Sequence, residues 1–494
     1  MAPKFGTSGL RGLVSELTPD CVAAHVLAFL AACPAGTGLC LGWDLRPSSP
    51  AIAGVVAAAA RSRGVAVSLC GAVPTPALAA WAGARGAAAI MVTGSHIPAD
   101  RNGLKFYTPS GEITAEQQRA IEAALGPLSA PAETVECADC SGACAADYLA
   151  RYVRAFGPAA LSGLRIGIWD HSTVARDLLA QVVRALGGLP LPFGRSADFV
   201  PLDTEALDPA AREALARRVR DGGLDAVISA DGDADRPLVV DDRGRVVPGD
   251  ILGPLTARTV GARVLCTPIT SNGAVDAMGF DRVRRSAIGS PKVIAAMLAE
   301  GAGCDGARVA GYEANGGFLL GFDAAGPAGP LPALMTRDAV LPAIAPLAAA
   351  RARGIALSAL VDDLPARFTA ADRLADYPTD RAALLVAALR DDRARLGAFL
   401  SGIGTEAGRD LTDGLRLRLT GGEVVHLRPS GNAPELRCYA EAANPARAAA
   451  LVRACLDRAA VAPDPGPPNP APHGNGGMDA AADIGDTGRG GDGN

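Results

Sequence analysis

Short apolar stretches with the length of buried strands alternate with helical segments, and this alternation restricts the fold more than any other feature of the sequence. The first such segments are a helix at 19–32, a strand at 39–43, a helix at 51–63 and a strand at 65–70. A further buried strand is expected at 87–92. Strands that alternate with helices predict mostly parallel sheets of the α/β class.

The same alternation returns twice after a stretch without periodicity at 127–146. A second α/β unit is expected from strands at 164–169 and 224–229 with helices at 172–186 and 209–221. A third follows from strands at 264–267 and 307–311 around a helix at 291–300. The last segment differs, because short strands at 415–419, 423–427 and 435–440 precede a closing helix at 445–460. This order of elements is typical of an α+β domain.

A chain of 494 residues is too long for one hydrophobic core, so several domains are expected. We predict three similar α/β domains with mixed, mostly parallel sheets at 1–134, 147–247 and 248–357. A fourth, α+β domain is predicted at 365–461. Residues 462–494 are rich in Pro, Gly, Asp and Asn and are predicted to form a disordered tail.

Charge and hydropathy exclude several classes of function. The chain carries 47 Lys and Arg against 52 Asp and Glu, a net charge of −5 without a basic block. This balance argues against binding to nucleic acid or to a membrane surface. Apolar runs such as 51–60 and 339–350 are too short to span a bilayer, and Pro342 and Pro346 interrupt the second. Residues 1–6 lack the apolar core of a signal peptide, so a cytoplasmic protein is expected.

The eleven cysteines do not predict a disulfide framework, because their number is odd and the chain is long. Cys137, Cys140 and Cys144 could supply three thiolates to a metal ion. Zinc requires four ligands, and no fourth Cys or His lies nearby in the sequence. We therefore favour a linker with unrelated cysteines over a metal site.

The stretch Thr93–Phe106 contains the first candidate for chemistry. Ser95 directly follows the strand expected at 87–92, and ligands of α/β sheets bind where strands end. Gly94 and Pro98 favour a tight turn that could present the serine hydroxyl. Lys105, ten residues later, is a compact cation suited to a phosphate group. Taken alone, this pattern favours an ordinary turn serine at position 95.

A second candidate is the acidic stretch Asp231-Gly232-Asp233-Ala234-Asp235-Arg236. Carboxylates at alternate positions of an extended segment point to one side, and three such groups suit Mg²⁺. An EF-hand is excluded because Arg236 stands where that loop needs glycine and a strand follows. A phosphatase with a nucleophilic aspartate and a solvated acidic turn remain alternatives.

Two further loops have the composition of ligand sites. Glu313 and Asn315 lie two residues apart and could contact neighbouring sugar hydroxyls, although a polar turn would look the same. Residues 428–437 combine small residues with Arg428 and Arg437, which is typical of a phosphate cradle but compatible with a plain hairpin. The N-terminal segment Lys4–Gly12 is a glycine-rich loop without the dinucleotide fingerprint.

Together these motifs resemble the α-D-phosphohexomutase family. The chain reads KFGTSGLRG, TGSHIP…NGLK, DGDADR, GYEANGG and RPSGNAPELR in the family's order, and the resemblance covers residues 4–460. Within the family it is most similar to bacterial phosphomannomutases. The resemblance implies a heart-shaped protein in which each of four domains contributes one loop to a central cleft.

The resemblance also implies roles for single residues. Ser95 would carry a phosphoryl group, with Mg²⁺ between that phosphate and Asp231, Asp233 and Asp235. Lys105, Arg11 and Arg236 would assist catalysis, and Lys105 would be the better candidate for a base. The remaining expected site residues bind substrate: Glu313 and Asn315 the sugar, and Arg428, Ser430, Gly431, Asn432 and Arg437 the phosphate that is not transferred.

The implied reaction interconverts mannose 6-phosphate and mannose 1-phosphate through a hexose 1,6-bisphosphate, which also serves as activator. Phosphoglucomutase, phosphoglucosamine mutase and a non-catalytic sugar-phosphate sensor are the alternatives.

The sequence departs from the family at Gly94 and Ile97, where TASHNP is usual, and at Asn432, where Thr is frequent. It also departs from GEMSGH, because Asn315 replaces the serine and Gly317 the histidine. The sequence does not predict an oligomeric state.

Overall fold

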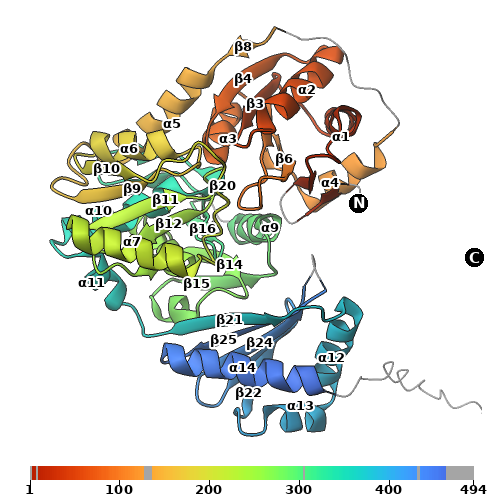
Figure 1. Cartoon of the computed structure of the whole chain (residues 1–494), viewed down its shortest axis with the longest axis vertical. Helices are drawn as coiled ribbons and strands as arrows, with labels where there is room; N and C mark the ends of the chain where they lie inside the picture. Colours follow the sequence, from red (N-terminus) through yellow and green to blue (C-terminus); the bar gives the residue numbers. More distant parts are fainter. Residues whose placement is uncertain (1–2, 7–8, 127–135, 304–305, 431–433, 463–494) are drawn as a thin grey trace, which may run out of the picture.

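Four large sheets and a two-stranded one, β18-β19, organise the computed structural model, which describes residues 3–6, 9–126, 136–303, 306–430 and 434–462 (Figure 1). The first sheet has the order β1-β2-β6-β5-β3-β4-β8, with β7 paired to β6. Strands β5, β3, β4 and β8 pair in parallel and the other pairs are antiparallel. The elements of this unit are β1 (Lys4–Phe5), β2 (Leu10–Leu13), α1 (Pro19–Ala32), β3 (Leu39–Trp43), α2 (Ser49–Ser62), β4 (Val67–Ala72), α3 (Thr75–Gly83), β5 (Ala88–Val92), β6 (Arg101–Thr108), β7 (Gly111–Glu112), α4 (Ala115–Ala123) and β8 (Ala138–Asp139).

The second and third sheets share one plan, in which three parallel strands are followed by two antiparallel ones. Their orders are β10-β9-β11-β12-β13 and β15-β14-β16-β17-β20. The second unit contains α5 (Ser141–Phe156), β9 (Arg165–Trp169), α6 (Arg176–Ala185), β10 (Leu189–Phe193), α7 (Pro209–Gly222), β11 (Ala226–Ala230), β12 (Pro237–Val240) and β13 (Val246–Val247). The third contains α8 (Gly249–Thr259), β14 (Val264–Pro268), a 3₁₀ turn (Gly273–Ala277), β15 (Arg282–Ser286), α9 (Ser290–Gly301), β16 (Val309–Tyr312), β17 (Phe318–Leu320), β18 (Ala324–Ala325), β19 (Pro330–Leu331), β20 (Leu334–Asp338), α10 (Val340–Ala352) and α11 (Leu357–Asp362).

The fourth sheet is entirely antiparallel, in the order β21-β25-β24-β23-β22. Its unit comprises β21 (Phe368–Leu374), α12 (Thr379–Asp391), α13 (Arg393–Leu400), β22 (Glu406–Asp410), β23 (Leu415–Leu419), β24 (Val424–Pro429), β25 (Leu436–Ala442) and α14 (Pro445–Val461). Its buried side chains form a core of their own, whereas the largest core is shared by the first three units. Figure 1 accordingly shows the fourth unit set apart from the others.

The predicted fold class is confirmed: three α/β units with mixed sheets precede an α+β unit. Local sequence signals account for several boundaries. Thr18 caps α1 by accepting a hydrogen bond from the backbone of Cys21 at 3.3 Å, and Pro19 occupies the first turn. Asp208 caps α7 in the same way, and Gly223 ends that helix in the left-handed conformation.

The structure differs from the sequence prediction at four places. Strand β8 extends the first sheet beyond residue 134, and α5 begins inside the stretch expected to lack periodicity. The domain boundaries themselves stay predictions. Helix α10 contains both prolines of the apolar run. Pro342 lies in its first turn, where no intrahelical hydrogen bond is lost, and the helix continues through Pro346 because it is buried on nearly all sides and packing compensates for the one lost there. Residues 172–175 form a loop instead of the start of a helix, since Thr173 and Val174 bond to the acidic loop.

Candidate active site

Ser95 lies in the loop between β5 and β6, at the end of a fully buried strand. Its backbone adopts a φ of 55°, in the left-handed region, and its N–H donates to the hydroxyl of Thr93 at 2.7 Å. Its hydroxyl donates to Oδ2 of Asp231 at 2.6 Å, across 136 residues of sequence. The structure thus brings together the two motifs that the sequence singled out for nucleophile and metal.

Arg46 holds the Ser95 loop in place. Its guanidinium is buried and donates to four backbone carbonyls of the loop, those of Ser95, Ile97, Pro98 and Arg101, at 2.5–3.0 Å. Asp44 balances its charge by accepting from Arg46 Nε at 3.0 Å, and also accepts from Thr93 and Gly94. The sequence analysis missed both residues, although they follow strand 39–43 at the same edge of the sheet.

The close approach of Arg46 explains the glycine at position 94. A Cβ atom there would lie 2.5 Å from Cζ of Arg46, which its hydrogen bonds prevent from moving away. We expect Gly94→Ala to lose about 1–3 kcal/mol of stability and to lower kcat by displacing the loop. Gly54→Ala, in open space on α2, is the control: it should leave kcat unchanged and should raise stability slightly, because alanine is favoured over glycine inside a helix. Thermal unfolding and steady-state kinetics measure both effects, and a Gly94→Ala enzyme equal to wild type would contradict this explanation.

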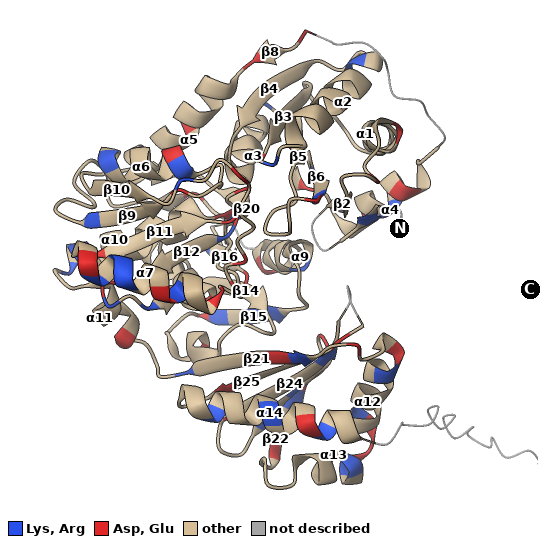
Figure 2. Ribbon diagram, viewed as in Figure 1, with Lys and Arg blue, Asp and Glu red and all other residues tan. Residues whose placement is uncertain are grey.

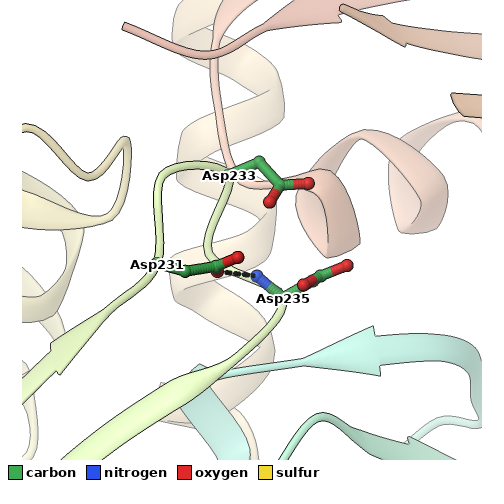
Figure 3. A group of neighbouring side chains, drawn as sticks. All are labelled: Asp231, Asp233 and Asp235. Carbon is green, nitrogen blue, oxygen red and sulfur yellow. Dashed lines mark hydrogen bonds between the residues drawn. The ribbon is translucent and has the colours of Figure 1, made fainter. Parts of the chain in front are cut away.

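The acidic loop connects the antiparallel strands β11 and β12 and brings three carboxylates together (Figure 3). One oxygen from each of Asp231, Asp233 and Asp235 lies within 4.8 Å of the others, and all three side chains are buried. The expectation of an extended segment is wrong, because Ala234 has a φ of 59° and the loop turns sharply. The side chains converge through this turn rather than through strand alternation.

Neighbouring elements fix the acidic loop. Thr75, at the start of α3, donates to Oδ2 of Asp233 at 2.6 Å, and Thr173 donates to the carbonyl of Asp231 at 2.7 Å. Gly232 lies so close to the serine loop that a Cβ atom would be 2.6 Å from the carbonyl oxygen of Ser95. The first two units therefore meet at the site with no space for a larger residue.

The three predicted cations all lie at the triad. Lys105, on β6, is buried and its Nζ donates to Asp233 and Asp235 at 2.5 Å each. Arg236 donates its backbone N–H to Asp231 at 3.1 Å, and its Nε lies 3.8 Å from Asp235. Arg11 lies on β2; burial lowers its pKa, and the charges of Asp233 and Asp235 oppose that shift.

The charge balance of the triad fits a bound cation. Burial and the charges of Asp233 and Asp235 raise the pKa of Asp231 well above its ordinary value. Burial also acts to raise the pKa of Asp233, but Lys105, Thr75 and Arg11 together lower it. Lys105 uses the Oδ2 atoms of Asp233 and Asp235, and the buried Oδ1 atoms of these two residues have no hydrogen-bond partner among the described residues. Such oxygens are suitable ligands for a hard divalent ion.

His96 follows Ser95 in the chain, and its imidazole lies close to the Ser95 hydroxyl. Burial, followed by the charge of Arg236, lowers the pKa of His96 to about 4, so this imidazole is neutral at pH 7. Its Nδ1 lies 3.4 Å from the Ser95 hydroxyl.

Cys144 is buried and its thiol lies 3.7 Å from the carbonyl of Ala77. Within the described part of the chain, Asp231, Asp233 and Asp235 form the one group of three or more acidic, His or Cys side chains placed to share a metal.

Glu313 connects to the triad through a residue that the sequence analysis missed. Arg337, on β20, donates to Glu313 Oε2 and to Asp235 Oδ2, each at 2.6 Å. All three side chains are buried. Asn315 lies in the same turn between β16 and β17, where its side-chain oxygen accepts from the backbone of Gly317 at 3.0 Å. Arg337 thus joins the loops of the second and third units.

The fourth unit faces the Glu313 loop across a cavity of 460 Å³, which we call the interdomain cavity. It is lined by Glu313 and Asn315 on one side and by Arg428 and Arg437 on the other. Ser430 follows two residues after Arg428 and is buried, but it does not line the cavity. Gly431 and Asn432 lie outside the described residues. The structure therefore places parts of the predicted sugar and phosphate loops around one cavity, and Arg337 connects Glu313 in its wall to Asp235 of the triad.

Basic and acidic residues are interspersed over the helices (Figure 2). Among the described residues, no helix combines the length and the apolar character needed to cross a membrane.

Comparisons with known proteins agree with this arrangement. Three domain models of the phosphoglucomutase/phosphomannomutase family match this chain. They are those of alpha/beta/alpha domain I at residues 2–129, alpha/beta/alpha domain II at 146–244 and the C-terminal domain at 379–458. The chain is 45% identical to a phosphomannomutase from Sinorhizobium fredii over 457 residues, which cover 90% of this chain and 96% of the relative. It is 41% identical to a phosphomannomutase from Salmonella muenchen over 462 residues, 92% of this chain and 94% of the relative.

More distant matches preserve the fold. A phosphoglucosamine mutase from Alkalilimnicola ehrlichii is 29% identical over 480 residues, covering 91% of this chain and 95% of the relative. Among solved structures, a phosphoglucomutase/phosphomannomutase family protein from Burkholderia thailandensis superimposes with a TM-score of 0.70 at 22% identity. That match covers 92% of this chain and 97% of the other.

Proposed function

We propose that this chain, which belongs to the phosphoglucomutase/phosphomannomutase family, interconverts mannose 6-phosphate and mannose 1-phosphate. As a member of that family it is an isomerase that transfers a phosphoryl group within a hexose phosphate. The observation that carries the proposal is the hydrogen bond between the Ser95 hydroxyl and Asp231, which sets a nucleophile against a carboxylate triad. The two relatives with over 40% identity support mannose as the sugar.

Ser95 would act in its phosphorylated form. The P–O bond to Ser95 breaks as a new P–O bond forms to O6 of mannose 1-phosphate, and the O6 proton passes to a base. The resulting 1,6-bisphosphate reorients and returns its 1-phosphoryl group to Ser95, which leaves mannose 6-phosphate. A hexose 1,6-bisphosphate would phosphorylate resting enzyme. The cleft contributes by aligning the reacting oxygen with the phosphorus atom.

Asp231, Asp233 and Asp235 would hold Mg²⁺ beside the phosphoserine, supported by the two unpartnered Oδ1 atoms. When bound, the ion neutralises charge on the transferring phosphoryl group. Arg236 and Arg11 would add positive charge at the same place. Removal of the ion by a chelator should abolish turnover, and Mg²⁺ should restore it.

Substrate binding would be divided between two loops. Glu313 and Asn315 would bind sugar hydroxyls, and Arg428, Ser430, Gly431, Asn432 and Arg437 the phosphate that is not transferred. The interdomain cavity supports this division, because it places both loops around one space. An anchor used in both half-reactions need not distinguish the 1-phosphate from the 6-phosphate, so the sugar can bind in either orientation.

Lys105 is the candidate base, and two variants separate its charge from its proton transfer. Lys105→Arg keeps a cation between Asp233 and Asp235 but cannot accept a proton at working pH. We expect it to retain metal binding and to lose about 10²–10⁴-fold in kcat. Lys105→Met should lose both metal binding and turnover. Steady-state kinetics with Mg²⁺ titration measures this, and a Lys105→Arg enzyme within threefold of wild type would assign Lys105 a purely electrostatic role.

The decisive experiment compares kcat/KM for mannose 1-phosphate, glucose 1-phosphate and glucosamine 1-phosphate with Mg²⁺ and a trace of glucose 1,6-bisphosphate. A preference for mannose 1-phosphate is expected. A preference for one of the other two would keep the mechanism and reassign the sugar. Absence of turnover with all three, on folded protein phosphorylated at Ser95, would support a sugar-phosphate sensor instead.

A further inference from the structure

Residues 199–205 belong to the connection between β10 and α7 of the second unit, and this segment reaches the interdomain cavity. No motif of the sequence marks it. Thr204 and Glu205 line the cavity together with Glu313 and Asn315 of the third unit. The second unit thus contributes a segment besides the acidic loop, and it does so at the space in which the substrate is proposed to bind.

Packing holds this segment against the loops of the site. The guanidinium carbon of Arg46, the residue that fixes the Ser95 loop, lies 4.0 Å from the centre of the Phe199 ring. The same ring packs on the acidic loop, because a Cβ atom on Gly232 would lie 2.9 Å from Cζ of Phe199. At the other end, Thr204 donates its hydroxyl to the carbonyl of Asn315 at 3.3 Å. A segment held at both ends is ordered before a ligand arrives, which lowers the entropic cost of binding.

Glu205 carries the group of this segment that is available to a ligand. It is exposed and lines the cavity, and its backbone N–H donates to Asp203 at 3.1 Å. Within the described part of the chain, its carboxylate takes part in no hydrogen bond or ion pair. By contrast, Oε2 of Glu313 accepts from Arg337, and the side-chain oxygen of Asn315 accepts from a backbone N–H of its own turn. Glu205 therefore adds open acceptor oxygens to this wall.

The groups around Glu205 determine which chemistry it can recognise. The residue is accessible from the cavity but closely surrounded by protein, and this desolvation raises the pKa of its carboxyl to about 7, against the opposing charge of Arg236. The negative charges of Asp203, Glu313 and Asp250 add to the rise in pKa. Once ionised, a carboxylate accepts hydrogen bonds and donates none, so it suits hydroxyl groups and repels phosphate oxygens.

We propose that residues 199–205 are a fifth loop of the candidate active site and that Glu205 binds a hydroxyl group of the sugar ring. The hydroxyl donates to the carboxylate, whose charge keeps the phosphate group away from this wall and toward Arg428 and Arg437. The contact adds to those proposed for Glu313 and Asn315. The inference rests on the function proposed for the Ser95 site, and it gives the second unit a part in substrate recognition.

Isothermal titration calorimetry at pH 8, where Glu205 is ionised, tests this contact. The ligands are mannose 1-phosphate and inorganic phosphate, and a chelator prevents turnover. We expect Glu205→Ala to bind mannose 1-phosphate about 10–100-fold more weakly than the wild type, the loss of one hydrogen bond to a charged group. Its affinity for inorganic phosphate, which lacks the sugar, should stay within about threefold of the wild type. Glu205→Gln should lie between for mannose 1-phosphate, because an amide oxygen still accepts a weaker hydrogen bond.

Glu213→Ala, exposed on α7 and outside the cavity lining, is the control and should bind both ligands like the wild type. The inference is overturned if folded Glu205→Ala binds mannose 1-phosphate with wild-type affinity. It is also overturned if both ligands bind more weakly by the same factor, since Glu205 would then only shape the cavity. Failure of the wild type itself to bind mannose 1-phosphate would instead overturn the function proposed for the Ser95 site, and this inference with it.

Discussion

Replacing Ser95 with alanine is expected to lower kcat for mannose 1-phosphate by about 10³-fold or more while leaving the fold intact. Among the described residues, Ser95 is the one whose hydroxyl donates to the Asp231 carboxylate. A left-handed backbone, four hydrogen bonds from Arg46 to the surrounding carbonyls and one from the Ser95 N–H to Thr93 hold it there. Asp231 loses one donor but keeps the backbone N–H groups of Asp235 and Arg236. The cost in stability should therefore stay near 1 kcal/mol, roughly one hydrogen bond.

Mass spectrometry gives this experiment a second readout. After incubation with glucose 1,6-bisphosphate, the wild-type peptide that contains Ser95 should gain one phosphoryl group, and the Ser95→Ala peptide should not. Ser62→Ala, at the end of α2 and far from the triad in the fold, serves as the control and should retain full activity. Phosphorylation of another residue, or turnover by Ser95→Ala within tenfold of wild type, would rule out Ser95 as the phosphoryl carrier.

The sequence predicted those parts of the site that lie within contiguous motifs. Ser95 and the three aspartates were predicted because they follow buried strands and suit phosphate or metal, and Lys105 because it is a cation ten residues after Ser95. The α/β class followed from the alternation of strands and helices, which is a local property of the chain. The convergence of the aspartates was predicted for an incorrect reason, since the left-handed Ala234 turns the loop.

The residues that were missed act across the fold. Arg337 stands in an ordinary edge strand, and its partners lie 24 and 102 residues away in sequence, so no local pattern marks it. Arg46 could have been found, because Asp44 and Arg46 follow strand β3 at the carboxyl edge where Ser95 also lies. The unusual Gly94 was visible as a departure from the family, but its cause is a contact with Arg46 that only the folded chain contains.

Arg337→Met is expected to have the second large effect, because it removes a buried bridge between two carboxylates. Arg337 is 5% exposed and donates to both Glu313 and Asp235, so its loss leaves the buried Glu313 carboxylate without the guanidinium and leaves Asp235 with Lys105 as its hydrogen-bonded cation. Breaking a buried ion pair from one side costs about 3–5 kcal/mol. We expect a destabilisation of this size in urea unfolding and a loss of about 10²-fold or more in kcat/KM, since both the sugar loop and the metal loop lose a support.

A double variant separates the stabilising role of Arg337 from its role in the reaction. Adding Glu313→Gln to Arg337→Met removes the negative charge that Arg337→Met leaves unbalanced at position 313, so much of the lost stability should return. Activity should not return, because Glu313 would no longer be available to bind the sugar and Asp235 would still lack its guanidinium partner. The stability and activity of Arg337→Lys should lie between those of the wild type and Arg337→Met, since one ammonium cannot bridge two carboxylates as a planar guanidinium does. If the double variant regained stability and activity together, Arg337 would be a structural residue only, and the coupling of the second and third units through it would have no part in the reaction.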